Sequence, residues 1–144
     1  MIRKAARHDL FILSELACRL WPDHAPDEMQ ADLAEIMAKP DSAFFLATNE
    51  EIPIGFAQCQ LRHDYVEGTS LSPVGYLEGI YVADGCRKQG IARALLAACE
   101  TWAKEQGCSE FASDCELVNT ESLHFHLNVG FEEANRIICF VKKI

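Results

Sequence analysis

A β-prone run, a basic turn and a long helical pattern follow one another in the middle of the chain. The run VGYLEGIYV (74–82) is apolar and is interrupted by Glu78 and Gly79, and a glycine inside a strand often marks a bulge or a close approach of backbone. The turn GCRKQG (85–90) gathers basic residues, although the chain has a net charge of −9. Because the first turn of a helix has unpaired N–H groups and the positive end of the helix dipole, this order predicts an anion site where the next helix begins, near Gly90.

The other elements are predicted from hydrophobic periodicity and turn residues. Apolar residues at helical spacing predict helices over 10–20 and 26–37, the second with Pro26 in its first turn. Further along we expect a hairpin over 44–61 with its turn at 49–51, a loop over 63–72, a strand over 109–114, a helix over 119–129 and a strand over 138–144. This order predicts one α/β domain over residues 1–144 with a mixed sheet.

Composition excludes two classes of partner. The chain has 13 basic residues against 22 acidic ones, whereas a nucleic-acid backbone requires a basic footprint, so we expect no nucleic-acid partner. No apolar stretch approaches the roughly 18–20 residues that span a membrane, and the N-terminus MIRKAARHDL lacks the apolar core of a signal peptide. We therefore expect a cytoplasmic protein without a membrane partner, whose negative charge favours cationic ligands.

The cysteines and histidines do not form a metal motif. Seven cysteines occur with no C-x-x-C pair, a pattern that favours buried reduced thiols over disulfides or metal ligands. His124 and His126 lie two residues apart, so on a helix their side chains point to different sides. We expect no metal site.

Two motifs resemble a known family. The segment RKQGIA (87–92) matches the Q/R-x-x-G-x-G/A signature of the GCN5-related N-acetyltransferases, and Asn119, Ser122, His126 and Gly130-Phe131 fall on that family's second motif. Within the family, the stretches RHDYVEGTSLSPVGYLEGIYV and EFASDCELVNTESLHFHLNVGFEE resemble the aminoglycoside 6′-N-acetyltransferases. The resemblance implies the family's α/β fold: a mixed, mostly antiparallel sheet flanked by helices, with splayed central strands.

The resemblance implies acetyl-coenzyme A as cosubstrate and assigns its site. Pantetheine is expected in the gap beside the bulged strand, held by backbone groups of Ile80, Tyr81 and Val82, one of whose N–H groups polarises the thioester carbonyl. The pyrophosphate is expected on the helix head, and Asn119 contacts the cofactor arm, although the same asparagine also suits a helix N-cap. The residues assigned to the helix head are Arg87, Lys88, Gln89, Gly90, Ile91, Ala92 and Arg93.

The resemblance also assigns the aminoglycoside and the catalytic groups. Glu78 and Asp114 are expected to bind the antibiotic, and Asp114 is a candidate base acting through water. The alternative for each carboxylate is an internal salt bridge. His126 stands where the family commonly has the tyrosine that protonates the thiolate. The other substrate positions are Trp21, His24, Tyr65 and Asn135, the last in place of an acidic residue; from sequence alone Trp21 suits the core and His24 an exposed loop.

Two other functions are compatible with these residues. The same fold could acetylate another cationic amine, such as a polyamine, a protein lysine or a protein N-terminus. A non-catalytic acyl-CoA-binding module is the second alternative, and the presence of Glu78 and Asp114 beside the cofactor motif argues against it. The resembling enzymes are dimers, so we also expect a homodimer.

Overall fold

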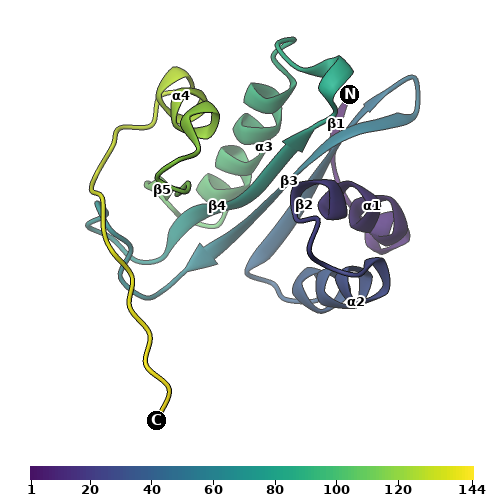
Figure 1. The fold of residues 1–144 in the computed structure, drawn as a ribbon. Coiled ribbons are helices and arrows are strands. Elements are labelled where there is room, and N and C mark those ends of the chain that lie inside the picture. Colours follow the sequence, from purple (N-terminus) through teal and green to yellow (C-terminus); the bar gives the residue numbers. More distant parts are fainter.

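A five-stranded sheet forms the centre of the computed structural model, which describes residues 1–144. The strands lie in chain order, and every neighbouring pair is antiparallel except β4 and β5, which are parallel. Figure 1 shows the twisted sheet running through the molecule between two groups of helices. The strands are β1 (Ile2–Lys4), β2 (Ser42–Asn49), β3 (Ile52–Arg62), β4 (Val74–Val82) and β5 (Phe111–Ala112).

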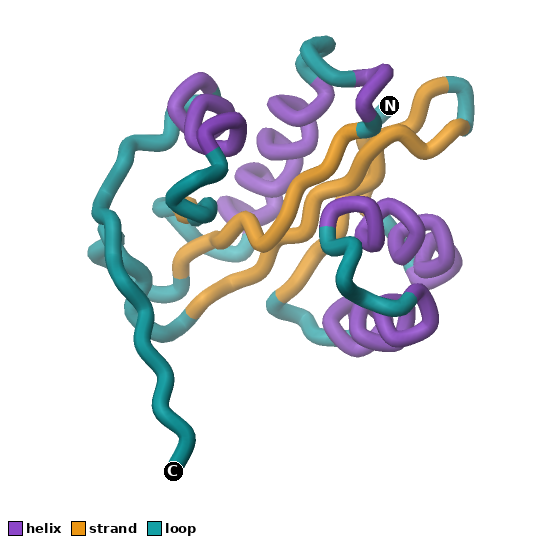
Figure 2. The backbone as a smooth tube through the Cα atoms, viewed as in Figure 1, coloured by secondary structure: helices purple, strands orange, loops and turns teal.

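Four α-helices flank this sheet, and two short 3₁₀ helices precede two of them. The first pair, α1 (Leu10–Leu20) and α2 (Pro26–Met37), covers one face, while α3 (Ile91–Glu105) covers the other, with α4 (Thr120–Asn128) beyond it (Figure 2). The 3₁₀ helices are η1 (Arg7–Asp9) and η2 (Asp84–Cys86). No helix has the length and apolarity needed to cross a membrane. The mixed α/β fold matches the fold class expected from the sequence.

Alternation along the central strands divides the core between the two faces. Successive side chains of a strand point to opposite sides of its sheet. Accordingly, Phe44 and Leu46 pack with α1 and α2, whereas Phe45 and Ala47 pack with α3. Because β2 is buried on both faces, seven of its eight residues are buried.

The predicted hairpin and the predicted bulge are both present. Glu50 and Glu51 have φ angles of 46° and 69°, so the turn between β2 and β3 uses two left-handed residues, as tight hairpins do. In the β3–β4 ladder, Cys59 pairs with Leu77 and Gln58 pairs with Gly79, which leaves Glu78 as the extra residue of a bulge. The bulge therefore changes the direction in which the Glu78 side chain leaves the sheet.

The strands predicted at the C-terminal end differ from those observed. The strand predicted over 109–114 is reduced to β5, and the strand predicted over 138–144 is wrong for the chain on its own. Residues 131–144 have no regular structure, and the end of the chain runs away from the sheet (Figure 1). A strand is held by hydrogen bonds to a neighbouring strand, and no strand lies beside this segment. Phe140 and Val141 are consequently 90% and 96% exposed.

Candidate active site

The strands β4 and β5 separate soon after they pair. Their register covers only Gly75 with Phe111 and Tyr76 with Ala112. Beyond this point, from Leu77 to Val82, no strand pairs with that edge of β4. The bulged residue Glu78 lies at the start of this free edge, so the opening between the two strands begins beside a carboxylate.

An aromatic and ionic network surrounds the two predicted carboxylates. Arg62, the last residue of β3, donates from Nε and Nη2 to the two oxygens of Glu78 at 3.0 and 2.9 Å. Its guanidinium also lies over the Tyr76 ring, 3.4 Å from the ring centre, which is a cation–π arrangement. The Tyr76 hydroxyl in turn donates a hydrogen bond to Asp114. The structure thus brings Glu78 and Asp114 into one network, and it pairs Glu78 with the internal arginine that the sequence left as an alternative.

The network fixes the protonation of Tyr76 and Arg62. Burial raises the pKa of the Tyr76 phenol far above its ordinary value of 10, and the hydrogen bond and charge of Asp114 raise it further. Burial lowers the pKa of Arg62, but the hydrogen bonds and charge of Glu78 outweigh that effect, so the net direction is upward. Tyr76 therefore remains a proton donor to Asp114, and Arg62 remains a cation beside Glu78.

His126 lies on α4 and reaches back to the end of β5. Its Nε2 lies 2.7 Å from the Ser113 hydroxyl, and its Nδ1 lies 2.6 Å from the backbone carbonyl of Ser122. The rings of Phe125 and Phe131 flank the imidazole at centroid distances of 5.5 and 5.1 Å. These contacts hold the ring beside Ser113, where β4 and β5 separate.

The head of α3 presents free backbone donors. None of the backbone N–H groups from Lys88 to Arg93 donates to a protein acceptor. Gly90 caps the helix with φ of 79°, in the left-handed region that favours glycine, and an added Cβ would meet open space. The loop of free N–H groups at a helix N-terminus is a geometry that binds phosphate.

Two of the basic side chains at this head are anchored to the protein. Arg87 donates to the carbonyl of Val82 at 3.0 Å and lies 3.1 Å from Asp84. Arg93 donates to the carbonyl of Asn128 at 2.9 Å, which ties α3 to the end of α4. These arginines therefore shape the helix head, which leaves its backbone N–H groups as donors without a protein acceptor.

The other predicted cofactor positions lie at the end of β4 and at the start of α4. Ile80, Tyr81 and Val82 are on the unpaired edge of β4, directly before the turn that leads to α3. Asn119 caps α4, since its side-chain oxygen accepts from the Ser122 N–H at 3.1 Å. The N-cap expected for Asn119 is thus present.

The remaining predicted substrate positions are more scattered. Trp21 packs edge-on against Phe56 and covers Gly79, where an added Cβ would lie 2.6 Å from the indole. The close approach explains why a glycine follows the bulge. Tyr65 is 78% exposed, and His24 is exposed with no side-chain partner. Asn135 donates to Glu67 at 2.9 Å, which holds the start of the C-terminal segment against the loop after β3.

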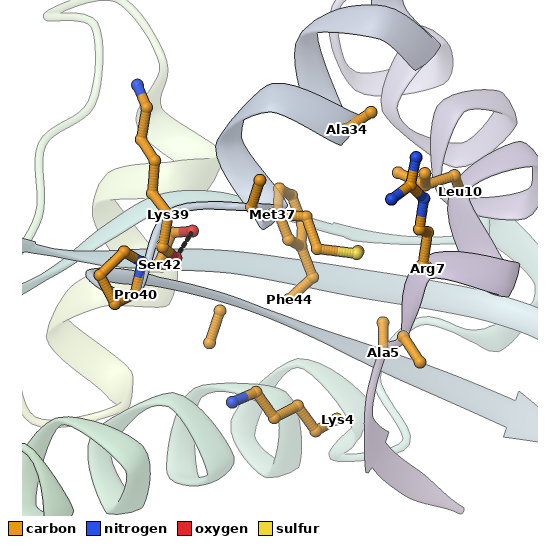
Figure 3. A pocket seen from close by; sticks show the side chains of 13 residues that line it. Lys4, Ala5, Arg7, Leu10, Ala34, Met37, Lys39, Pro40, Ser42 and Phe44 are labelled. Atoms are coloured by element: carbon orange, nitrogen blue, oxygen red, sulfur yellow. Dashed lines mark hydrogen bonds between the residues drawn. The ribbon is translucent and has the colours of Figure 1, made fainter.

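A separate cavity of about 560 Å³ lies between η1, α2 and β2. Figure 3 shows Met37 and Phe44 at its centre, with Lys4 and Lys39 extending to either side. None of the predicted site residues lines it. The cavity is therefore distinct from the β4–β5 opening. No group of histidine, cysteine, aspartate or glutamate side chains is arranged to hold a metal ion.

Three residues of the site were absent from the sequence prediction. They are Arg62, Tyr76 and Ser113, which contact Glu78, Asp114 and His126 respectively. One signal was present for Tyr76, because it lies two residues before Glu78 on a predicted strand and two-residue spacing repeats a face. Arg62 comes from a different strand and Ser113 meets a helix, so neither contact follows from local spacing.

Known proteins resemble this chain over nearly its whole length. Residues 10–131 match the acetyltransferase (GNAT) family. Aminoglycoside N(6′)-acetyltransferase type 1 of Salmonella typhimurium is 42% identical over 99% of this chain and 98% of its own length. The corresponding enzyme of Serratia marcescens is 42% identical over 90% of this chain and 89% of its own length.

Solved structures of related enzymes have the same fold. The aminoglycoside acetyltransferase AAC(6′)-Iy in complex with the bisubstrate analog CoA-S-monomethyl-acetylneamine superposes with a TM-score of 0.96 at 40% identity, covering 100% of this chain and 98% of that one. AAC(6′)-Ih of Acinetobacter baumannii gives 0.94 at 36% identity, with the same coverage. Sequence motifs, sheet topology and these matches agree: the chain belongs to the acetyltransferase (GNAT) family.

Proposed function

We propose that this protein is an aminoglycoside 6′-N-acetyltransferase that transfers acetyl from acetyl-coenzyme A to the 6′-amine of the antibiotic. One observation carries the proposal: the unpaired edge of β4, from Leu77 to Val82, begins beside Glu78 and leads into the turn before the free backbone N–H groups at the head of α3. A cationic acceptor and a polyanionic donor would therefore meet there. The names of the relatives support the reaction, and the bisubstrate complex of AAC(6′)-Iy supports the pairing of these two ligands.

Acetyl-coenzyme A would lie along the edge of β4 and end on the helix head. Backbone groups of Ile80, Tyr81 and Val82 face no strand on that side, so an extended pantetheine could pair with them as a further strand would. The N–H groups of Lys88 to Arg93 would receive the pyrophosphate. Arg87, Gln89 and Asn119 complete this site, Arg87 by holding the turn through the carbonyl of Val82.

Glu78 and Asp114 would bind the ammonium groups of the aminoglycoside. Glu78 has one partner, Arg62, and both side chains reach solvent, with exposures of 18% and 38%. An incoming ammonium can therefore approach Glu78 without breaking a buried structure, and it adds a second cation to a carboxylate with free acceptor sites. Trp21, His24, Tyr65 and Asn135 would form the outer contacts to the antibiotic.

Transfer requires a neutral amine and a polarised carbonyl. Asp114 would accept the first proton of the ammonium through a water molecule, and the bond from Tyr76 holds the carboxylate in place for this role. A backbone N–H on the free edge of β4 would stabilise the oxygen of the tetrahedral intermediate. His126 would participate in returning a proton to the departing sulfur.

We also propose a homodimer, which the exposed C-terminal tail supports. Residues 137–144 contain apolar β-prone side chains that face water in the single chain, and β5 is an edge strand with a neighbour on one side only. Exposed apolar strands and free edges normally find a partner. A second copy of the chain would cover the apolar side chains of the tail and would also give β5 a second neighbour.

Sedimentation of the Phe140→Asp/Val141→Asp variant tests this. We expect the intact chain to sediment as a dimer and the variant as a folded monomer. A variant that remains dimeric would place the interface elsewhere.

A cytoplasmic location is part of the same proposal. All seven cysteines are free thiols, including the exposed Cys115 and Cys139. Thiols stay reduced in the cytoplasm, where acetyl-coenzyme A is also available.

The acceptor specificity is tested by coenzyme A release across a panel of amines. Aminoglycosides with a 6′-amine should turn over, and analogues with a 6′-hydroxyl should bind yet release little coenzyme A, because a hydroxyl is a far poorer nucleophile near neutral pH. NMR of the product should show acetyl at the 6′-nitrogen alone. Equal turnover of both analogue types would assign another amine, and faster turnover of polyamines or basic peptides would assign another substrate class.

A further inference from the structure

Both ring nitrogens of His126 are occupied by protein groups. The Nδ1 lies 2.6 Å from the Ser122 carbonyl and the Nε2 lies 2.7 Å from the Ser113 hydroxyl. The aromatic rings of Phe125 and Phe131 cover the sides of the imidazole. His126 therefore has no free N–H to offer a departing sulfur, and any proton that it exchanges with the reaction passes through Ser113.

Hydrogen-bond chemistry fixes the direction of the Ser113–His126 contact. A carbonyl oxygen only accepts, so Nδ1 must carry a hydrogen to make the bond with Ser122. In the neutral ring Nε2 is then the acceptor, and the Ser113 hydroxyl donates to it. The imidazole is thus held in the tautomer that can take a proton from Ser113.

Ser113 stands at the first position where the central strands separate. It follows Ala112, the last residue of β5 that pairs with β4. Its hydroxyl lies 3.5 Å from the carbonyl of Leu77, directly before the bulged Glu78. The hydroxyl therefore lies at the narrow end of the opening that contains the carboxylates.

We propose that Ser113 is a catalytic residue, and that with His126 it carries the proton from the reacting nitrogen to the sulfur of coenzyme A. The proposal rests on the function assigned above, which places the thioester in this opening. In this proposal two groups do the work of the single tyrosine hydroxyl common in the family. Ser113 contacts the reacting atoms, and His126 holds the proton after it leaves the nitrogen and before it reaches the sulfur.

The step balances in protons and electrons. The neutral amine attacks the thioester carbon, which forms a C–N bond and leaves a positive nitrogen and a negative oxygen. The nitrogen gives a proton to the Ser113 oxygen while the Ser113 proton moves to Nε2 of His126. The C–S bond then breaks, its electron pair goes to sulfur, and the carbonyl is restored. Ser113 protonates the sulfur and regains its proton from His126, so the pair returns to its starting state.

The simplest competing role for the contact is structural, as a tie between α4 and β5. A tie predicts losses of stability and cofactor affinity on mutation, whereas a relay predicts a loss in the chemical step alone. The test therefore measures the single-turnover rate of acetyl transfer, the acetyl-coenzyme A dissociation constant and the melting temperature for each variant.

Ser113→Ala should lower the single-turnover rate about 10²-fold or more, in the range of positioned acid–base groups, with little change in cofactor affinity or melting temperature. His126→Ala should act similarly, and the double variant should be no slower than the slower single one, because the two residues act as one unit. Ser113→Thr keeps the hydroxyl and should retain most of the rate. Ser109→Ala, an exposed serine on the same segment, is the matched control.

Proton inventory in mixed H₂O and D₂O gives an independent readout. Two protons move in each transfer, so the wild-type rate should fall along a curve as deuterium content rises, and Ser113→Ala should lose this curvature. A rate within threefold of wild type for Ser113→Ala, or additive losses in the double variant, overturns the relay. Absence of coenzyme A release by the wild-type protein with every amine would instead overturn the proposed function.

Discussion

Two arginine–carboxylate pairs in this molecule have the same chemistry and different surroundings. Arg3 donates to both oxygens of Asp9 at 2.7 Å, and Arg62 donates to both oxygens of Glu78 at 3.0 and 2.9 Å. The two arginines are equally exposed, at 38%. The carboxylates differ, because the Asp9 side chain is 3% exposed and that of Glu78 is 18% exposed.

The difference lies in what else contacts each carboxylate. Asp9 also accepts from the backbone N–H of Ala6 at 2.8 Å, so it joins β1 to the first helical segment in a closed packing. Glu78 has Arg62 alone and faces the β4–β5 opening. An enclosed carboxylate with several donors serves the fold, whereas one with a single partner at an opening remains available to a ligand.

The largest expected effect comes from breaking the enclosed pair. Asp9→Asn removes the charge and turns an amide N–H₂ toward the Arg3 guanidinium. We expect a loss of about 3 kcal/mol in the free energy of unfolding, at the lower end for a broken buried pair because Arg3 can still reach water. Urea denaturation gives the free energy, and activity per folded molecule should stay near the wild-type value. A large loss of specific activity would show that Asp9 also acts on the site.

Breaking the Arg62–Glu78 pair should have the opposite effect, with a large loss of activity and a small loss of stability. Glu78→Gln keeps the shape and removes the charge, so kcat/KM for the aminoglycoside should fall about 10²-fold, equivalent to about 2.7 kcal/mol of transition-state stabilisation. The free energy of unfolding should change by less than about 1 kcal/mol, as for partly exposed ion pairs. Cofactor affinity, measured by calorimetry, is the control. A variant that unfolds readily but keeps its specific activity would make both pairs structural.

The sequence predicted the parts of the fold that repeat a local pattern. The helices at 10–20 and 26–37 and the strand at 74–82 have the predicted bounds, because hydrophobic periodicity, Pro26 and the flanking turns all indicate the same ends. Gly79 predicted the bulge that the structure has at Glu78, and the Trp21 indole lies over this glycine. The strand predicted over 138–144 is absent. Its apolar, β-prone residues form a strand only when another strand lies beside them, and no strand of the single chain does so.

The candidate site was predictable only where a motif is continuous in sequence. The helix head around Gly90 could be inferred because its donors are consecutive residues. The partners of the acidic and histidine residues could not, since Arg62 meets Glu78 across a sheet and Ser113 meets His126 between a strand and a helix. Such contacts depend on the register and packing of elements that no local spacing encodes.

Acid titration should give the smallest of these effects, and it measures the contribution of the Arg3–Asp9 pair to stability. The hydrogen bonds from Arg3, opposed in part by burial and aided by the Ala6 N–H, lower the pKa of Asp9 from 3.8 to about 2. A carboxyl whose folded-state pKa is depressed adds stability that is present above its unfolded pKa and is lost as pH falls toward the folded value. The shift corresponds to about 2 kcal/mol, which should disappear between roughly pH 4 and pH 2.

The measurement is the free energy of unfolding of wild-type protein minus that of Asp9→Asn, obtained by urea denaturation at a series of pH values. Other carboxyl groups titrate in both proteins and cancel in the difference, so the remaining pH dependence belongs to Asp9. The difference should be constant from about pH 7 to pH 5 and should shrink by about 2 kcal/mol at the acid end. A difference that stays constant to pH 3 would mean that the Arg3–Asp9 pair does not select the ionised carboxyl. The Arg3–Asp9 pair would then resemble the Arg62–Glu78 pair in its small effect on folding. The two pairs would differ only in that Glu78 lies at the β4–β5 opening.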